Sequence, residues 1–331
     1  MSQYNVINAK NLMKDYVISV KEKGLKGMAK SLIHSEKKIV HAVKGVNLKM
    51  EVGELVGYIG PNGAGKSTTI KMLSGILSPT GGEVKVCGIN PAKKRIENAL
   101  NVGAVFGQKT QLWWDLPVRE TFELLRRMYN IPMDQYKKNV AEFMDYLDIG
   151  SFADQAVRQL SLGQRMRAEI AASLLHNPKV LFLDEPTIGL DVNVKVSVRE
   201  FIKKINKERG VTILLTTHDL QDIEQLARRI VVINHGQVGF DGSMEALADK
   251  YAGGKHRVRF TLQKDAEKIE LPAGMTGHYT LSKNGLHVQI EHDQTISASA
   301  MVAVLLQKYT LTDIDIHGPQ IEDVVMEVYK A

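Results

Sequence analysis

Eight consecutive residues early in the chain have the types and spacing of a phosphate-binding loop. They are Gly60, Pro61, Asn62, Gly63, Ala64, Gly65, Lys66 and Ser67. Glycines let successive backbone N–H groups turn towards phosphate oxygens, and the following helix adds the positive end of its dipole. Lys66 can reach the β- and γ-phosphates, and the Ser67 hydroxyl can bind Mg²⁺. A strand-like run, ELVGYIG, precedes the loop, and a helix-like run from Thr68 follows it, which is the context the motif requires.

A second string, VLFLDE at residues 180–185, ends four apolar residues in two carboxylates. Such a run predicts a buried parallel strand, and ligands bind at the carboxyl end of these strands. Asp184 can hold Mg²⁺ through water, and Glu185 can polarise the water that attacks the γ-phosphate. Together with the glycine loop the string predicts a P-loop NTPase. A GTPase is disfavoured, because the nearest guanine-reading string, residues 206–209, lacks the aspartate.

The string from Leu160 to Gln164, Leu-Ser-Leu-Gly-Gln, stands just before a predicted helix. Here the chain resembles the nucleotide-binding subunit of ABC transporters, whose signature is L-S-G-G-Q. The resemblance runs from about Asn5 to Gly242 with the motifs in the expected order. Four further residues match family positions: Gln108 the Q-loop, Asp191 the D-loop, His218 the switch histidine and Tyr16 the aromatic that stacks on adenine. A packed aromatic is the alternative for Tyr16, because burial is a common use of such a ring.

The resemblance implies that ATP and Mg²⁺ are the cofactors. Thr68 completes the phosphate-binding set, and Mg²⁺ would be held by Ser67, Gln108 and Asp184. In the family the signature, here Ser161, Gly163 and Gln164, completes the ATP site of the opposite subunit. The implied partner is therefore a second copy or a homologous ATPase subunit in a head-to-tail dimer. Gln108 and His218 would act beside the catalytic Glu185. Leu162 departs from the signature by replacing its first glycine.

Longer stretches, such as FGQKTQLWWDLPV and RQLSLGQRMRAE, are similar to the ABC-2 type exporter branch and within it to the viologen-exporter-like group. This resemblance implies ATP-driven export through separate ABC-2 type permease subunits. The Trp113–Trp114 pair follows Gln108 and would meet the permease, although a buried tryptophan pair is the alternative. The competing function is a soluble regulatory ABC ATPase that moves no solute.

The order of predicted elements indicates an α/β protein with an ABC-type helical subdomain and an antiparallel β subdomain. We expect an ATPase domain over residues 1–250, with a basic insertion at about 17–40 and the helical subdomain at about 110–176. After Tyr251 the pattern predicts a small C-terminal α+β domain, ferredoxin-like, over residues 251–331. Strands that alternate with helices of this length favour a parallel core sheet.

The net charge of +6 among 331 residues is localised. Residues 1–50 hold ten lysines against three acidic residues, whereas the rest of the chain is nearly balanced. We therefore expect no nucleic-acid partner. Leu25, Met28, Leu32 and Ile33 recur at helical spacing among the lysines, which predicts a basic amphipathic helix. It could touch anionic lipid or a permease loop, or be a solvated hairpin.

The chain holds one cysteine, Cys87, which excludes a disulfide framework and a cysteine-rich zinc site. No apolar run approaches the length of a membrane span. The sequence therefore predicts a protein held at the cytoplasmic face of the membrane through its permease.

Overall fold

The computed structural model describes residues 5–20, 36–107, 109–217, 219–251, 256–265, 268–269, 277–282, 285–292, 298–317 and 321–330. The chain forms two compact units, residues 1–241 and 242–331. Gln108, His218 and the four apolar residues of the expected basic helix lie outside the described residues.

A six-stranded sheet forms the core of the first unit. Its order is β5 (Val102–Phe106), β6 (Val180–Asp184), β7 (Thr212–Thr216), β3 (Leu55–Ile59), β8 (Arg229–Asn234) and β9 (Gln237–Gly242). The pairs that join β5, β6, β7, β3 and β8 are all parallel. Every side chain of β3, β6 and β7 is buried, as the apolar runs of these strands predict. The carboxyl ends of these strands consequently meet at one edge of the sheet.

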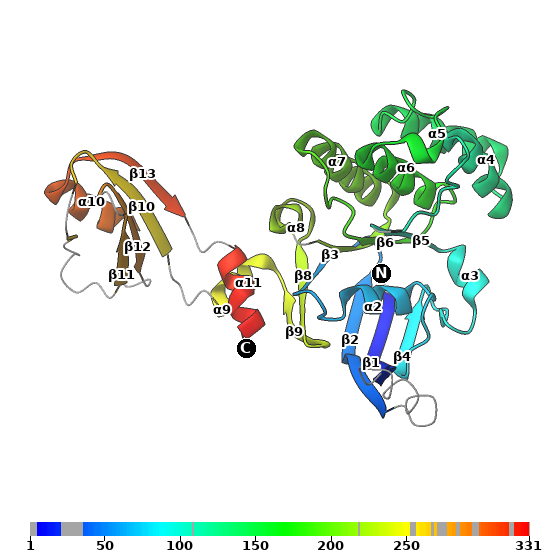
Figure 1. Cartoon of the computed structure of the whole chain (residues 1–331), viewed down its shortest axis with the longest axis horizontal. Coiled ribbons are helices and arrows are strands. Elements are labelled where there is room, and N and C mark those ends of the chain that lie inside the picture. Colours follow the sequence, from blue (N-terminus) through cyan, green and yellow to red (C-terminus); the bar gives the residue numbers. More distant parts are fainter. Residues whose placement is uncertain are drawn as a thin grey trace, which may run out of the picture. The chain divides into compact units, whose positions relative to one another are not determined.

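Helices cover both faces of this sheet (Figure 1). On one side lie α4 (Val118–Met128), α5 (Met133–Tyr146), α6 (Leu162–Leu174) and α7 (Val192–Arg209), with the 3₁₀ turn Val157–Gln159 before α6. On the other side α2 (Lys66–Leu73) packs between the core sheet and a smaller sheet. Two short helices, α3 (Arg95–Ala99) and α8 (Leu220–Leu226), complete the unit. The α/β class, the ABC-type helical layer and the antiparallel β subdomain predicted from the sequence are thereby present.

The smaller sheet is antiparallel, with the order β2 (Glu36–Glu51), β1 (Asn5–Val20) and β4 (Gly81–Val86). Both long strands reach further than the sequence pattern suggested. Residues 17–20 and 36–40, assigned above to the basic insertion, continue β1 and β2 and pair with each other as far as Val20 and Glu36. The β-branched residues at these strand ends favour an extended backbone, which explains why the strands continue.

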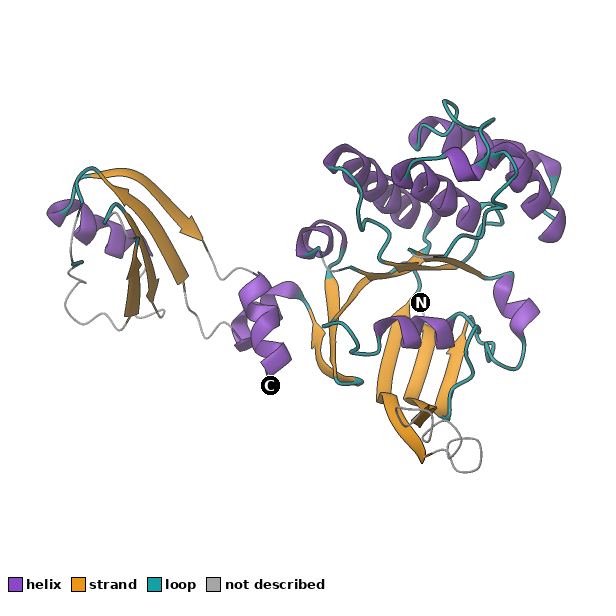
Figure 2. Cartoon of the chain, viewed as in Figure 1, coloured by secondary structure: helices purple, strands orange, loops and turns teal. Residues whose placement is uncertain are grey.

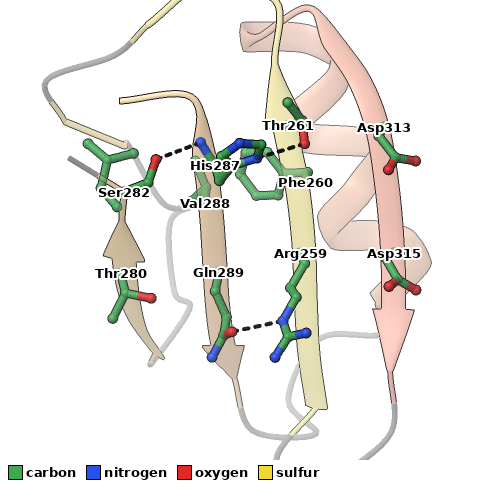
Figure 3. Close-up of a pocket in the computed structure, with 11 residues that line it drawn as sticks. Arg259, Phe260, Thr261, Thr280, Ser282, His287, Val288, Gln289, Asp313 and Asp315 are labelled. Atoms are coloured by element: carbon green, nitrogen blue, oxygen red, sulfur yellow. Dashed lines mark hydrogen bonds between the residues drawn. The ribbon is translucent and has the colours of Figure 1, made fainter. Parts of the chain in front are cut away.

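The second unit contains a four-stranded antiparallel sheet whose order is β11 (Gly277–Leu281), β12 (His287–His292), β10 (His256–Leu262) and β13 (Leu311–His317). One sheet face packs on α10 (Ala298–Lys308), with Phe260, Ile290 and Met301 in its core. The other face is polar and carries a hollow of about 510 Å³ (Figure 3).

Helix α9 (Met244–Tyr251) contacts α11 (Ile321–Lys330) and belongs with this unit, so the unit begins at Gly242, earlier than the boundary expected from the sequence. Figure 2 distinguishes its helices and strands. The ferredoxin-like assignment stays a prediction.

Candidate nucleotide-binding site

The glycine loop links the end of β3 directly to the start of α2. Gly65 adopts φ 105°, which a side chain would strain, and a Cβ there would lie 2.6 Å from the carbonyl oxygen of Ala42 on β2. The loop is thus held against the antiparallel sheet. Because α2 begins at Lys66, its unpaired N–H groups point into the loop, as phosphate binding requires.

Lys66 folds back over the loop and is only 6% exposed. Its Nζ donates to the carbonyl oxygen of Gly60 at 2.6 Å and to that of Pro61 at 3.2 Å. Burial lowers the pKa of Lys66, and the carboxylates of Glu185 and Asp184 oppose this shift. A buried ammonium group that holds only carbonyl oxygens is well suited to bind phosphate oxygens.

The Asp184 carboxylate at the end of β6 lies beside Ser67 of the glycine loop. Asp184 Oδ1 accepts from Ser67 Oγ at 3.1 Å and from Thr216 Oγ1 at 2.7 Å. Thr216 occupies the position opposite Asp184 on the neighbouring strand β7. A hydroxyl and a carboxylate are oxygen ligands of the kind that Mg²⁺ prefers, so Ser67 and Asp184 fit the ion. No sequence motif pointed to Thr216, because its contact with Asp184 arises only from the strand pairing.

Glu185 follows β6 with φ 58°, a left-handed conformation that is costly for a residue with a side chain. Its N–H donates to both the carbonyl oxygen and Oγ1 of Thr216, at 3.0 and 3.2 Å. These bonds offset a backbone strain of about 1–3 kcal/mol. The strand pairing thus fixes the turn that carries the expected catalytic carboxylate.

A buried polar network supports the turn after Glu185. Asp222 on α8 accepts from Thr187 at 2.5 Å, from Thr217 at 3.3 Å and from Arg199 at 2.9 Å. The Arg199 and Asp222 side chains are 8% and 1% exposed. Thr217 directly precedes His218, the expected switch histidine, so the network fixes the backbone up to that residue.

The neighbourhood of Gln108 is fixed in a similar way. Gly107 N donates to the backbone oxygen of Asp184 at 3.0 Å, which ties the start of this loop to the end of β6. Further on, buried Glu169 of α6 accepts from the Thr110 hydroxyl and from Gln111 N, the latter at 3.2 Å. Residues on both sides of Gln108 are therefore held, one to the carboxylate strand and the other to the signature helix.

The signature residues form the N-terminus of α6. Ser161 Oγ accepts from Gln164 N at 3.2 Å, and Gln164 Oε1 accepts from Ser161 N at 2.9 Å, which is a complete capping box. Leu162 is 39% exposed, and a Cβ at Gly189 would lie 3.0 Å from its side chain. Leu162, which replaces the signature glycine, thus packs against the segment that leads to Asp191. The Asp191 side chain caps α7 by accepting a hydrogen bond from Val194 N at 3.0 Å.

The structure therefore brings Lys66, Ser67, Asp184 and Glu185 together. The signature and Asp191 form a separate group, and no hydrogen bond between described residues joins the two groups. Tyr16 lies on β1 opposite Val40, close along the strand pair to the Ala42 that supports Gly65. Lys14 Nζ lies 5.5 Å from the centre of its ring.

The two tryptophans after the Q-loop are exposed, at 38% for Trp113 and 49% for Trp114. The alternative of a buried pair is therefore wrong. Their backbone is fixed from both sides, because Leu116 N donates to Trp113 O at 3.1 Å and Arg158 N donates to Trp114 O at 3.0 Å. A rigid segment presents these rings to solvent, as an interface residue requires.

A phosphate loop, a carboxylate strand and a separately capped signature helix on one parallel sheet define an ABC-type P-loop ATPase. The family model described as "ABC transporter" matches residues 43–188. The ABC transporter ATP-binding protein NatA of Bacillus subtilis is 32% identical over 212 residues, which cover 64% of this chain and 86% of the relative. The chain belongs to the ATP-binding proteins of the ABC transporter family and is an ATPase.

Other relatives differ in how much of their length is matched. The Nod factor export ATP-binding protein I of Burkholderia orbicola is 36% identical over 211 residues, covering 64% of this chain and 69% of that protein. The chain spans only 26% of ABC transporter A family member 1 of Dictyostelium discoideum, at 33% identity over 230 residues and 69% of this chain.

Among solved structures, a dimeric ATP-binding cassette in a post-hydrolysis state, bound to ADP and Pi, matches with a TM-score of 0.59 and 29% identity. The match covers 72% of this chain and 98% of that structure. Within the described part of the chain, no helix is both long and apolar enough to cross a bilayer.

Proposed function

We propose that the chain is the ATP-binding and hydrolysing subunit of an ABC-2 type transporter and drives export through a separate membrane permease. The observation that carries the proposal is the grouping described above. The phosphate and carboxylate residues form one group, the signature residues form another, and no hydrogen bond between described residues joins the two. Two copies in head-to-tail arrangement would complete two ATP sites. A solved relative that is dimeric and bound to ADP and Pi supports the formation of a dimer.

In the proposed cycle, Lys66 and the loop N–H groups bind the phosphates, and Ser161 with the Gly163 amide of the second copy closes over the γ-phosphate. Ser67 and Asp184, with Gln108, would hold Mg²⁺, which supplies positive charge to the phosphate oxygens when bound. Glu185 orients and polarises the attacking water, and His218 contacts the γ-phosphate. Phosphate release then reopens the dimer.

Coupling to a permease is proposed at the exposed Trp113–Trp114 segment. The hydrogen bonds from Thr110 and Gln111 to Glu169 tie this segment to α6, so the two would move together. Closure of the dimer over ATP would then displace the surface that meets the membrane subunit. The proposed location of the protein is therefore the cytoplasmic face of the membrane. The similarity to a Nod factor export protein supports export, and the FGQKTQLWWDLPV stretch supports the viologen-exporter-like group.

Replacing Glu185 with glutamine tests the site. We expect turnover to fall at least about a hundredfold, because the general base is lost, while ATP binding persists and a stable ATP-bound dimer accumulates on size exclusion. Ser161→Ala is the matched control: it should weaken that dimer and leave nucleotide binding to the single chain intact. Full ATP turnover in Glu185→Gln would contradict the assignment.

Co-purification from native membranes tests the coupling. We expect a polytopic membrane protein to be recovered with the wild-type chain, and less of it with a Trp113→Ala/Trp114→Ala variant. Intact ATPase activity with no membrane partner recovered would favour the soluble regulatory alternative instead.

A further inference from the structure

Thr216, the last residue of β7, places one buried hydroxyl between the two carboxylate residues of the site. It is 0% exposed. Its Oγ1 donates to Asp184 Oδ1 at 2.7 Å and accepts from Glu185 N at 3.2 Å. A hydroxyl carries a single proton, and a backbone N–H can only donate. The proton of Thr216 therefore goes to Asp184, and the roles of the two bonds cannot be exchanged.

Packing alone does not require a hydroxyl at this position. The three residues before Thr216 on β7, residues 213–215, are aliphatic and buried, and valine has nearly the same shape as threonine. Burying a hydroxyl costs free energy unless it is hydrogen-bonded, so the effect of Thr216 lies in its partners. Both partners belong to the segment that carries the site carboxylates, whereas the neighbouring Thr217 bonds to Asp222 in a different network.

Asp184 receives a second, longer hydrogen bond from the phosphate loop. Ser67 Oγ donates to the same Oδ1 atom at 3.1 Å. In the proposed cycle Ser67 would also hold Mg²⁺, so its bond to Asp184 depends on what the loop binds. The bond from Thr216 comes instead from within the core sheet, where β6 and β7 pair Asp184 with Thr216. The sheet therefore supplies the hydrogen bond that orients Asp184 independently of the loop.

The backbone of Glu185 is held by the same residue. Glu185 N donates to the carbonyl oxygen of Thr216 at 3.0 Å as well as to its Oγ1. Glu185 has φ 58°, and a left-handed residue with a side chain persists only where its surroundings hold it. Loss of the hydroxyl would remove one of the two acceptors that hold this turn.

We propose that Thr216 is a positioning residue of the ATPase, whose hydroxyl fixes the Asp184 carboxylate and the Glu185 turn relative to each other. This inference rests on the proposed roles of Asp184 and Glu185. Both side chains must meet the bound nucleotide in one geometry, and a displacement of about 1 Å can cost about a hundredfold in rate. One hydroxyl that contacts both residues couples their positions.

ATP hydrolysis and amide hydrogen exchange of the purified full chain test the proposal. Thr216→Val keeps the shape of the side chain and removes the hydroxyl. We expect kcat to fall about 10- to 100-fold, as for other groups that orient a metal-binding carboxylate. KM for ATP should change little, because Lys66 and the loop N–H groups are untouched. In the nucleotide-free chain the Glu185 N–H should exchange with solvent faster than in the wild type. Thr216→Ser retains a hydroxyl and should keep kcat within a few-fold of the wild-type value.

Thr212→Val is the matched control, because Thr212 is also 0% exposed and lies at the other end of β7. Its Oγ1 accepts from Gly53 N at 2.9 Å, away from the site carboxylates. This variant should lower the Tm and leave kcat unchanged. If the valine variant at position 216 does not fold, Thr216→Cys replaces it, because a thiol is a weak donor and kcat should lie below that of Thr216→Ser.

A wild-type kcat in Thr216→Val, or equal losses in the valine and serine variants, overturns the proposal. An equal loss of kcat in Thr212→Val overturns it in favour of simple destabilisation. Glu185→Gln, measured alongside, separates this inference from the proposed function. Loss of turnover in Glu185→Gln with a wild-type kcat in Thr216→Val overturns the positioning role alone, whereas full turnover in Glu185→Gln overturns the proposed site and this inference with it.

Discussion

Replacement of Asp222 by asparagine tests whether the buried network positions the catalytic turns as well as stabilising the fold. Asparagine has nearly the same shape as aspartate, but it removes the charge that compensates Arg199, whose side chain is 8% exposed. Among the described residues, Arg199 Nε has no hydrogen-bond partner even before the change. Breaking one side of a buried ion pair costs about 3–5 kcal/mol. We expect the free energy of unfolding of the first unit to fall by about 3 kcal/mol, which lowers its Tm by about 6–12 °C.

The same change should slow ATP hydrolysis below the melting transition. Asp222 holds Thr187, two residues after Glu185, and Thr217, which precedes His218. Loosening both turns misplaces groups that must lie within hydrogen-bond reach of the γ-phosphate, so we expect kcat to fall by about tenfold or more. ATP affinity should change little, because Lys66 and the glycine loop are not part of the network.

Two further variants decide between positioning and simple destabilisation. The double replacement Arg199→Met/Asp222→Leu removes both charges and should recover part of the lost stability without recovering kcat. Arg119→Gln breaks an exposed pair, with side chains 53% and 78% exposed, and should alter stability by at most about 1 kcal/mol. If kcat stays at the wild-type value in Asp222→Asn, the network does not position the catalytic turns.

Three more outcomes follow from individual contacts. Burial lowers the pKa of His176 to about 4, so the unfolded chain takes up a proton at a higher pH than the folded chain does. The free energy of unfolding should therefore fall by about 3 kcal/mol as the pH drops from 6.5 to 4. Urea titrations of His176→Phe should show a smaller fall over the same pH range. Burial raises the pKa of Glu169. The Glu169→Ala variant loses the hydrogen bond from Thr110, and it should lower permease-stimulated ATPase activity more than the basal rate. Leu162→Gly removes the contact with Gly189, and analytical ultracentrifugation should show a weaker ATP-bound dimer.

The chemistry-bearing residues could be found in the sequence because each lies in a short local string. Lys66, Ser67, Asp184 and Glu185 are recognisable from their immediate neighbours, and the structure brings these four together. Thr216, Asp222 and Glu169 could not be found in this way. Each acts on a segment 32 to 59 residues away, through a strand pairing or a helix contact that no local spacing encodes.

The ends of β1 and β2 show a different limit of sequence reasoning. Lysines between apolar residues suggested an insertion over residues 17–40, but strand pairing continues through Val17↔Ile39 and on to Val20↔Glu36. A short apolar and basic run satisfies a helical and an extended pattern about equally well. Cross-strand pairing decides between them, and it depends on a partner segment that lies further along the chain.

Helix α6 connects the signature residues to the segment that carries the two tryptophans. Its first turn carries Ser161, its Leu162 packs against Gly189, and its Glu169 holds Thr110. A helix is stiff along its length, so a force on its capped N-terminus reaches the segment after the Q-loop without any intervening flexible element. In the proposed dimer, ATP held by one copy would contact Ser161 of the other and thereby act on that copy's tryptophan surface. ATP bound by one copy would thus move the permease contact of the other copy. Inactivating the phosphate loop of one subunit should therefore impair the permease contact of the opposite subunit.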